Sequence, residues 1–305
     1  MKVTPNPIFI SANWELSEGL IKFRKKYKFS LITVLHGLEV TRLHSQKYHK
    51  KIANFKNTLA YSDQVIAVSD YTRDEAMSIS GEQGIITIPN FVDTGKFFPK
   101  SKNKSRDHFQ LGHSDKILLS LSRLVKRKGH HIVIRALQIV KKEIPEINYL
   151  IAGVGDESYK NELNQLVTEL GLEKNVSFLG YIDENQKVLI YNSCDVYIMN
   201  SLDTDETGDS EGFGITFLEA NASGKPVIGT NVGGIPDAVE NDVNGILVAP
   251  NNPQATADAI IRLFSNDAYY QKISNNAISR VNDNFSLLHI GEKYQQIISS
   301  VASNL

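Results

Sequence analysis

The feature that most constrains the fold of this 305-residue chain is a regular alternation of short aliphatic runs with longer stretches of helical periodicity. Between residues 117 and 265 this alternation predicts parallel strands joined by helices, that is, a doubly wound α/β domain. Its six strands are expected near residues 117–122, 148–152, 176–179, 195–199, 227–229 and 246–248. Its helices are expected near residues 129–143, 157–170, 184–193, 213–223 and 253–265.

A shorter alternation comes before it and predicts a second, incomplete α/β layer. The apolar runs that we read as its strands are residues 7–10, 30–35, 64–69 and 85–88. Its helices are expected at residues 15–26, 45–61 and 70–79, with Asp70 as the cap of the last one. The layer lacks the first strand and glycine loop with which a complete dinucleotide-type domain begins.

These patterns give three expected parts of the chain. Residues 1–98 form a partial N-terminal domain, residues 99–285 form a C-terminal domain, and residues 286–305 form a helix that returns toward the first domain. Residues 94–115 are rich in Lys, Ser and Asn with weak periodicity, so we read them as a linker.

The composition favours an ordinary globular protein of the cytoplasm. Cys194 is the only cysteine, so a disulfide framework and a cysteine-based zinc site are not expected, and a reducing compartment is. The N-terminus has no apolar signal-peptide core, and no apolar run approaches the ~20 residues that span a membrane.

The charge of the chain is unevenly distributed. Residues 1–60 contain 11 Lys/Arg and 3 Asp/Glu, a net charge of +8, whereas the remaining residues contain 22 and 31, a net charge of −9. The basic residues gather within residues 22–56, which suits contact with the inner face of an anionic membrane or with a phosphorylated acceptor. The competing interpretation is a solvated helix face. Nucleic acid is not an expected partner, because no nucleic-acid-binding motif accompanies the charge.

The segment Ser210–Ala220 places two carboxylates, Glu211 and Glu219, on either side of a glycine-rich helix start. The first turn of a helix directs N–H groups at an anion, and Gly212 and Gly214 let the backbone approach a ligand closely. With Glu211 before the helix and Glu219 about two turns inside it, they lie roughly 12 Å apart at ~1.5 Å per residue. A glycosidase pair needs roughly 5–10 Å, so two hydroxyl-bearing rings are a better fit. The alternative is an amphipathic helix with two solvated glutamates.

Four cationic residues, among them Arg123 and Lys128, follow a predicted strand in Ser122-Arg123-Leu124-Val125-Lys126-Arg127-Lys128-Gly129. Ligands of doubly wound domains bind beyond the carboxyl ends of the strands, so Arg123 and Lys128 are placed to hold phosphate charge. The alternative is a solvated basic turn.

Glycine-rich turns end several other strands. Gly153 and Gly155 permit close backbone approach, although Asp156 could simply cap the next helix. They do not match a nicotinamide-nucleotide fingerprint, which requires the first strand of a domain and a later acidic residue. The segment 180–182 could line a flat base, and the loop 231–236 could form a second wall on the phosphate side.

His36 follows a buried strand directly and could donate to a phosphate oxygen or orient an acceptor hydroxyl. A turn histidine with ordinary partners is the competing interpretation. The acidic run Asp203-Thr204-Asp205-Glu206 could bridge a cation to a diphosphate, but we expect a solvated loop and no metal site. A serine triad has no support, because no nucleophile elbow occurs.

These motifs together resemble the retaining nucleotide-sugar glycosyltransferases of the GT-B fold, specifically glycosyltransferase family 4. The similarity covers roughly residues 30–290. The segments that carry it are EGFGITFLEA (211–220), GKPVIGTNVGGIPDAV (224–239), VNGILVAP (243–250), SRLVKRKG (122–129), IAGVGDE (151–157) and IPNFVD (88–93). The resemblance implies two Rossmann-like domains, of which the N-terminal one is incomplete here.

The resemblance also implies roles for individual residues. Arg123 and Lys128 would bind the donor diphosphate, Glu211 the hydroxyls of the transferred sugar, and Glu219 the ribose. His36 would lie near the transfer centre. The remaining implied contacts are the N–H groups of Phe213, Gly214 and Ile215 on phosphate and sugar, Gly212 in the same motif, and Gly153, Tyr181 and Ile182 at the nucleobase.

The implied activity is metal-independent transfer of a hexose, with retention, from a uridine- or guanosine-diphosphate sugar to a glycan or lipid-linked acceptor. Such a reaction serves cell-surface polysaccharide or glycolipid synthesis and needs no further cofactor. The short N-terminal region leaves three explanations open: a truncated product, a split enzyme completed by a partner chain or dimer, or a compact variant. The alternative function is a non-catalytic or partner-dependent nucleotide-sugar-binding subunit.

Overall fold

The computed structural model describes residues 7–24, 26–203 and 209–303. The contacts within the chain divide it into two compact units. Unit 1 comprises residues 1–90, 203–213 and 287–305, and unit 2 comprises residues 91–202 and 214–286.

Unit 1 is built on a four-stranded parallel sheet in the order β1-β2-β3-β4. The strands are β1 (Ile8–Ser11), β2 (Ser30–Leu35), β3 (Gln64–Ala67) and β4 (Ile85–Thr87). The helices are α1 (Trp14–Arg24), α2 (Leu38–Thr41), the 3₁₀ segments Arg42–His44 and Gln46–Lys51, α3 (Ile52–Ala60), α4 (Asp70–Ser80) and α13 (Leu287–Ser303).

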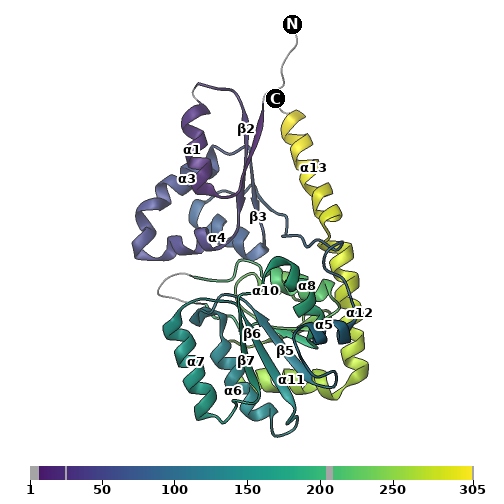
Figure 1. Ribbon diagram of the computed structural model, residues 1–305. Helices are drawn as coiled ribbons and strands as arrows, with labels where there is room; N and C mark the ends of the chain where they lie inside the picture. The colour runs from purple at the N-terminus through teal and green to yellow at the C-terminus, as the bar shows by residue number, and fades with distance from the viewer. Residues whose placement is uncertain (1–6, 25, 204–208, 304–305) are drawn as a thin grey trace. The chain divides into compact units, whose positions relative to one another are not determined.

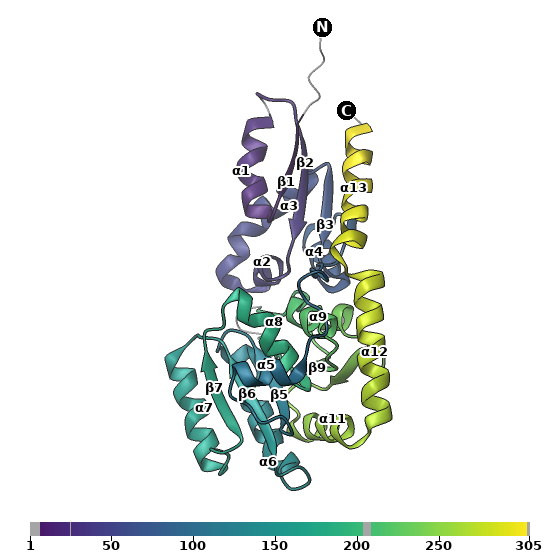
Figure 2. The same ribbon diagram turned by 45° about the vertical axis from the view of Figure 1, so that its right-hand side comes forward.

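The core of unit 1 forms where α1 and α3 pack on one face of this sheet, as Figures 1 and 2 show, while α13 runs along the other. The indole of Trp14 is buried there and meets the ring of Phe55 edge-on, with ring centroids 5.4 Å apart. All six residues of β2 are buried, as expected for a strand covered on both faces. In contrast, β1 lies at one edge of the sheet and exposes Phe9 and Ile10.

Unit 2 contains a six-stranded parallel sheet in the order β10-β9-β8-β5-β6-β7. Its strands are β5 (Lys116–Leu121), β6 (Ile147–Ala152), β7 (Val176–Gly180), β8 (Val196–Ile198), β9 (Val227–Thr230) and β10 (Gly245–Val248). The strand order reverses between β5 and β8, and ligands of doubly wound domains bind at such a switch point.

Helices cover both faces of this sheet. They are α5 (Lys102–His108), the 3₁₀ turn Lys126–Lys128, α6 (His130–Val140), α7 (Glu157–Glu169), α8 (Glu184–Ser193), α9 (Ile215–Ala222), α10 (Ile235–Ala238), α11 (Pro253–Ser265) and α12 (Asp267–Asn284). Aliphatic side chains of α6, α7 and α11 form one apolar core with the strands. Rings from α8, β8 and α9 stack edge-on or tilted on the other face, through Tyr191, Tyr197 and Phe217.

The predicted α/β class with two parallel, Rossmann-like sheets is confirmed. Three local predictions are wrong. The linker 94–115 contains α5, whose fully buried Arg106 donates to the carbonyl of Ser193 and the carboxylate of Asp195. Ser69, and not Asp70, caps α4 by accepting from the Thr72 N–H. The helix expected from residue 213 begins at Ile215.

Among the described residues, no helix is both long and apolar enough to cross a membrane.

Candidate functional site

The loop after β5 carries the two predicted phosphate-binding cations and meets the end of β8. Arg123 is exposed, and Lys128 lies half-buried at the end of a 3₁₀ turn. Gly129 follows with a φ of +67°, and a Cβ there would lie 1.8 Å from the carbonyl oxygen of Asn200. The Lys128 Nζ lies 3.5 Å from the Met199 Sδ. Only a glycine at position 129 permits its backbone to approach Asn200 this closely. The preceding residue, Lys128, therefore lies at the switch point of the sheet.

A buried polar chain supports this loop from inside the unit. The Ser122 hydroxyl lies 3.1 Å from His130 Nε2, and His130 Nδ1 lies 3.1 Å from the Tyr149 hydroxyl. Burial, with a smaller effect from Lys128, lowers the pKa of His130 to about 4, so the imidazole is neutral at neutral pH. No local sequence pattern predicts this polar chain, because His130 and Tyr149 belong to different elements.

The glycines after β6 contact other strand-end loops. Gly153 has a φ of +129°, and a Cβ there would lie 1.9 Å from the Ser122 carbonyl oxygen. Its N–H donates to the Gly180 carbonyl at 2.7 Å. Asp156 caps α7 by accepting from the Ser158 N–H at 2.8 Å, which confirms the capping interpretation. The loops after β5, β6 and β7 therefore form one continuous rim.

Tyr181 and Ile182, predicted to approach the nucleobase, differ in accessibility. Tyr181 is 71% exposed and its ring is available to a ligand. Ile182 is buried, so that its backbone is the part able to face a ligand. Both precede the capping box of α8, in which the Asp183 carboxylate accepts from the N–H groups of Asn185 and Gln186.

Glu219 lies just over one turn inside α9, because the helix starts two residues later than expected. It is only 8% exposed, and its Oε2 accepts a hydrogen bond from the Tyr191 hydroxyl at 2.6 Å. The Lys187 Nζ lies 3.9 Å from Oε1. Burial raises the pKa of Glu219, whereas the Tyr191 hydrogen bond and Lys187 oppose that rise. The alternative of a solvated glutamate is wrong for Glu219.

The same motif begins in unit 1. Residues 203–213, with Glu211, Gly212 and Phe213, group with unit 1, whereas Gly214 and Ile215 group with unit 2. Phe213 is buried, and Gly214 has a φ of +92° immediately before the first turn of α9. Ile215 is exposed at that helix start. The eleven-residue signature is thus divided between the two units of the chain.

Within unit 1, the Glu211 segment lies against the loop that carries His36. A Cβ on Gly212 would lie 2.1 Å from the carbonyl oxygen of His36, and a Cβ on Gly37 would lie 2.6 Å from the Gly212 Cα. His36 itself is exposed, and its N–H donates to Glu39 Oε1 at 2.6 Å. The structure therefore places Gly212, the residue after Glu211, against the backbone of His36 and Gly37.

Sequence reasoning missed the ion pair at the start of this segment. The Arg42 Nε donates to Asp209 Oδ1 at 2.7 Å, and the pairing raises the pKa of Arg42. The signal for it was the contrast between a basic N-terminal region and the acidic run that precedes Glu211.

The predicted solvated loop at Asp203–Glu206 falls mostly on residues 204–208, outside the described residues. Asp203 accepts from the Ser210 hydroxyl at 2.6 Å. In residues 7–24, 26–203 and 209–303, no group of three His, Cys, Asp or Glu side chains could hold a metal ion.

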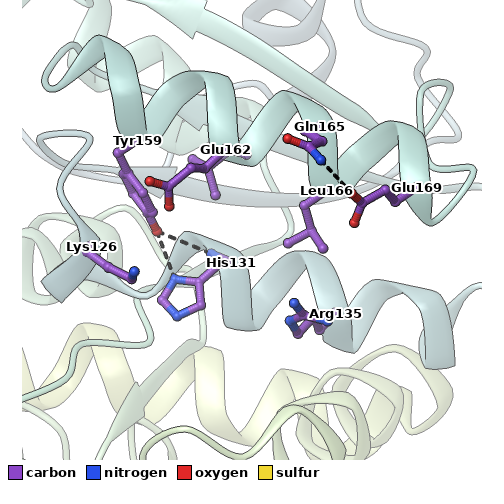
Figure 3. Close-up of a pocket in the computed structure, with 9 residues that line it drawn as sticks. Lys126, His131, Arg135, Tyr159, Glu162, Gln165, Leu166 and Glu169 are labelled. Atoms are coloured by element: carbon purple, nitrogen blue, oxygen red, sulfur yellow. Dashed lines mark hydrogen bonds between the residues drawn. The ribbon is translucent and has the colours of Figure 1, made fainter.

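Two cavities lie apart from these residues. One, of about 280 Å³, lies between α6 and α7, as Figure 3 shows, where the Tyr159 hydroxyl lies 2.9 Å from His131 Nδ1. Lys126 and Arg135 line it together with Glu162 and Glu169, so its charges balance. The other, of about 640 Å³, lies in unit 1 and is lined by Ile21, Lys22, Arg24, Asn57 and Tyr61. None of the predicted site residues lines either cavity.

The sequence matches the family model described as Glycosyl transferases group 1 over residues 101–280, and the model Glycosyltransferase Family 4 over residues 8–96. It is 28% identical over 275 residues to N-acetyl-alpha-D-glucosaminyl L-malate synthase of Bacillus anthracis, covering 90% of this chain and 68% of that protein. It is 32% identical over 205 residues to a GDP-mannose-dependent alpha-(1-6)-phosphatidylinositol monomannoside mannosyltransferase of Mycobacterium tuberculosis, covering 66% of this chain and 52% of that protein.

Among solved structures, Anabaena HepE in complex with UDP and glucose has a TM-score of 0.81 and 25% identity. The match covers 96% of this chain and 77% of HepE. The chain therefore spans only about half to two thirds of the length of the two curated relatives and about three quarters of this solved structure.

Proposed function

Because the chain belongs to the family of group 1 glycosyl transferases, with the two parallel-sheet domains of GT-B proteins, we propose that it transfers a hexose from a nucleotide-diphosphate sugar to a glycan or lipid-linked acceptor. The observation that carries the proposal is the contact of Gly129 with Asn200, which puts Lys128 at the switch point of the unit 2 sheet. The donor is a uridine- or guanosine-diphosphate sugar. HepE with UDP and glucose and the GDP-mannose-dependent relative support this choice of donor.

The proposed chemistry requires charge on the leaving group. The bond from the sugar to the diphosphate breaks through an oxocarbenium-like transition state, so negative charge grows on the phosphate oxygens. Arg123 and Lys128 supply positive charge there, and the N–H groups of Phe213, Gly214 and Ile215 donate to the phosphate and sugar oxygens. These groups can stabilise the leaving diphosphate without a metal ion.

The two glutamates hold hydroxyl groups on either side of that bond. Glu219 accepts from the ribose, with Gly153, Tyr181 and Ile182 lining the base. Glu211 accepts from the transferred sugar, and His36 lies near the transfer centre. The acceptor hydroxyl attacks from the face that the diphosphate leaves, so that the anomeric configuration is retained. In this role the protein serves cell-surface polysaccharide or glycolipid synthesis.

The test is nucleotide release by the purified chain from UDP-glucose and from GDP-mannose, with and without a chelator. We expect turnover with at least one donor, unchanged by the chelator, and an α-configured product by NMR. Lys128→Ala should lower turnover by about 10²–10³-fold, as removal of a transition-state donor does, while the chain stays folded. Wild-type rates in that variant would contradict the assignment of the donor site.

A second candidate function is a nucleotide-sugar-binding subunit that needs a partner chain. The observation that favours it is β1, an edge strand with exposed Phe9 and Ile10, because apolar edges tend to pair with further strands. Thermal shift with UDP and GDP separates the two candidates. Stabilisation by a nucleotide without turnover of any donor would favour the subunit, since a bound ligand stabilises by mass action.

We also propose that unit 1 contacts the cytoplasmic face of an anionic membrane. Lys22 and Arg24 line the groove between α1 and α3, and Phe23 and Tyr27 are exposed beside it. Exposed aromatic rings and cations together favour the interface of an anionic bilayer.

The measurement for this surface is sedimentation with phosphatidylcholine vesicles that contain or lack phosphatidylglycerol. Lys22→Glu should weaken binding to the anionic vesicles about fivefold or more, since each cation near the surface contributes ~1 kcal/mol. The exposed Lys142 of unit 2 gives the matched control, Lys142→Glu, which should bind like wild type. Equal binding to both kinds of vesicle would refute the membrane contact.

A further inference from the structure

The segment that carries Glu211 is fixed within unit 1 by contacts on both sides of that residue. At its start, the guanidinium of Arg42 donates to both carboxylate oxygens of Asp209, from Nε at 2.7 Å and from Nη2 at 3.4 Å. At its end, the Thr72 hydroxyl donates to the Gly212 carbonyl at 3.5 Å.

The Arg42 pair differs from the neutral contact between Thr72 and Gly212 in strength and in geometry. A two-pronged, charge-assisted hydrogen bond between guanidinium and carboxylate fixes direction as well as distance. Arg42 follows α2, which begins directly after His36 and Gly37, so the guanidinium and His36 are carried by the same short stretch of backbone. Asp209 lies only two residues before Glu211. The pair therefore joins the His36 stretch to the Glu211 stretch.

The contact between Gly37 and Gly212 leaves the 209–213 segment little room to move. Gly37 and Gly212 meet backbone to backbone, with no space for a Cβ on either residue. A sideways shift of the 209–213 segment would lose this contact and would carry the Glu211 carboxylate with it. Small displacements of this kind are costly in catalysis, where a misplacement of ~1 Å lowers rates by about 10²-fold.

We propose that Arg42 is a positioning residue for Glu211: by pairing with Asp209 it holds the Glu211–Gly212 backbone against His36 and Gly37. The inference rests on the proposed transferase function, in which Glu211 and His36 act on the transferred sugar. The side chains of Arg42 and Asp209 are 40% and 26% exposed, and ion pairs this exposed contribute little to folding stability. The pair should therefore affect turnover far more than it affects melting.

The experiment compares Arg42→Ala, Asp209→Asn and the charge exchange Arg42→Asp/Asp209→Arg in the full chain. Each single variant should lower kcat about 10–100-fold. The donor KM should stay within about threefold of wild type, because the phosphate-binding cations belong to unit 2, and the melting temperature within about 3 °C. The charge exchange should recover most of kcat. Arg262→Gln is the matched control, since Arg262 and Asp242 form another exposed pair at 2.8 Å in unit 2.

A second readout keeps this inference separate from the proposed function. Amide hydrogen exchange of residues 209–213 should be faster in Arg42→Ala than in wild type, and unchanged in Arg262→Gln. If the wild type turns over no donor, the proposed function fails, and hydrogen exchange alone decides whether Arg42 anchors the segment. Unchanged exchange, a wild-type kcat in both single variants, or no recovery in the charge exchange would overturn the inference.

Discussion

The two glutamates of the EGFGITFLEA segment are only eight positions apart, yet the protein holds them in different ways. Glu219 is buried inside a helix of unit 2, where Tyr191 donates to its carboxylate. Glu211 lies in a loop of unit 1, next to a glycine pressed against His36. Glu219 is therefore part of the packing of its unit, whereas the position of Glu211 depends on residues far away in the sequence. This difference predicts that removing the Glu211 carboxylate lowers turnover, whereas removing the Glu219 carboxylate lowers the stability of unit 2.

The largest expected effect is on catalysis at Glu211. Glu211→Ala should lower turnover by about 10³-fold, because a group that binds the sugar in the transition state is lost. The melting temperature should stay close to that of wild type, since the residue is half-exposed. Steady-state kinetics together with thermal unfolding test this prediction. A large drop in melting temperature would show that Glu211, like Glu219, belongs to the fold.

The next largest expected effect is a loss of the folding stability of unit 2 at acid pH. His130 has a folded pKa of about 4 against about 6.5 in an unfolded chain, so its neutral form is favoured by folding. The contribution of the neutral His130 to the free energy of unfolding is therefore present above pH ~6.5 and is lost as the pH falls toward 4. The shift corresponds to about 3 kcal/mol. We expect His130→Gln to show a weaker loss of stability over this range.

The two units can be followed separately in that acid titration. Trp14 is the only tryptophan of the chain and is buried in unit 1, so its fluorescence reports on that unit. Amide exchange in β5 and β6 reports on unit 2. Acid should accelerate exchange in β5 and β6 before it changes the fluorescence of Trp14. The reverse order would contradict the assignment of the acid-sensitive group to unit 2.

The smallest expected effect is a difference in the free energy of unfolding between two variants of Glu219. Glu219→Ala leaves the Tyr191 hydroxyl buried without its acceptor and should lower the free energy of unfolding by about 1–3 kcal/mol. Glu219→Gln keeps a carbonyl acceptor and should lose less. Chemical denaturation of the two variants is the measurement. Equal stability of Glu219→Ala and wild type would show that this carboxylate is not part of the packing.

Much of the fold could be predicted from the sequence, because parallel strands covered on both faces appear as aliphatic runs, as in β2 and β9. The rule that ligands bind at strand ends predicts Lys128 as a site residue, and the structure places its Nζ 3.5 Å from the Met199 Sδ, just after β8. Helix α5 could not be predicted in this way. Its Arg106 is buried because carbonyl groups and Asp195 surround it, and these partners come from other parts of the chain.

The same limit applies to the candidate site. Arg42 and Asp209 are separated by 167 positions, so no local pattern joins them. The burial of Glu219 depends on Tyr191 in α8, which a helix considered alone does not reveal. Local periodicity therefore predicts the elements and the ends at which ligands bind. The partners that orient a side chain within those ends require the tertiary structure.

The division of the signature between Phe213 and Gly214 has a consequence for protein engineering. A chimera that exchanges the donor specificity of two such proteins would ordinarily be joined near residue 90, where the chain passes from unit 1 to unit 2. Such a chimera would import a foreign 203–213 segment opposite a native His36 loop. Grafting should therefore leave residues 203–213 with the recipient, so that the segment of Glu211 and the His36 loop that Gly212 contacts come from the same protein.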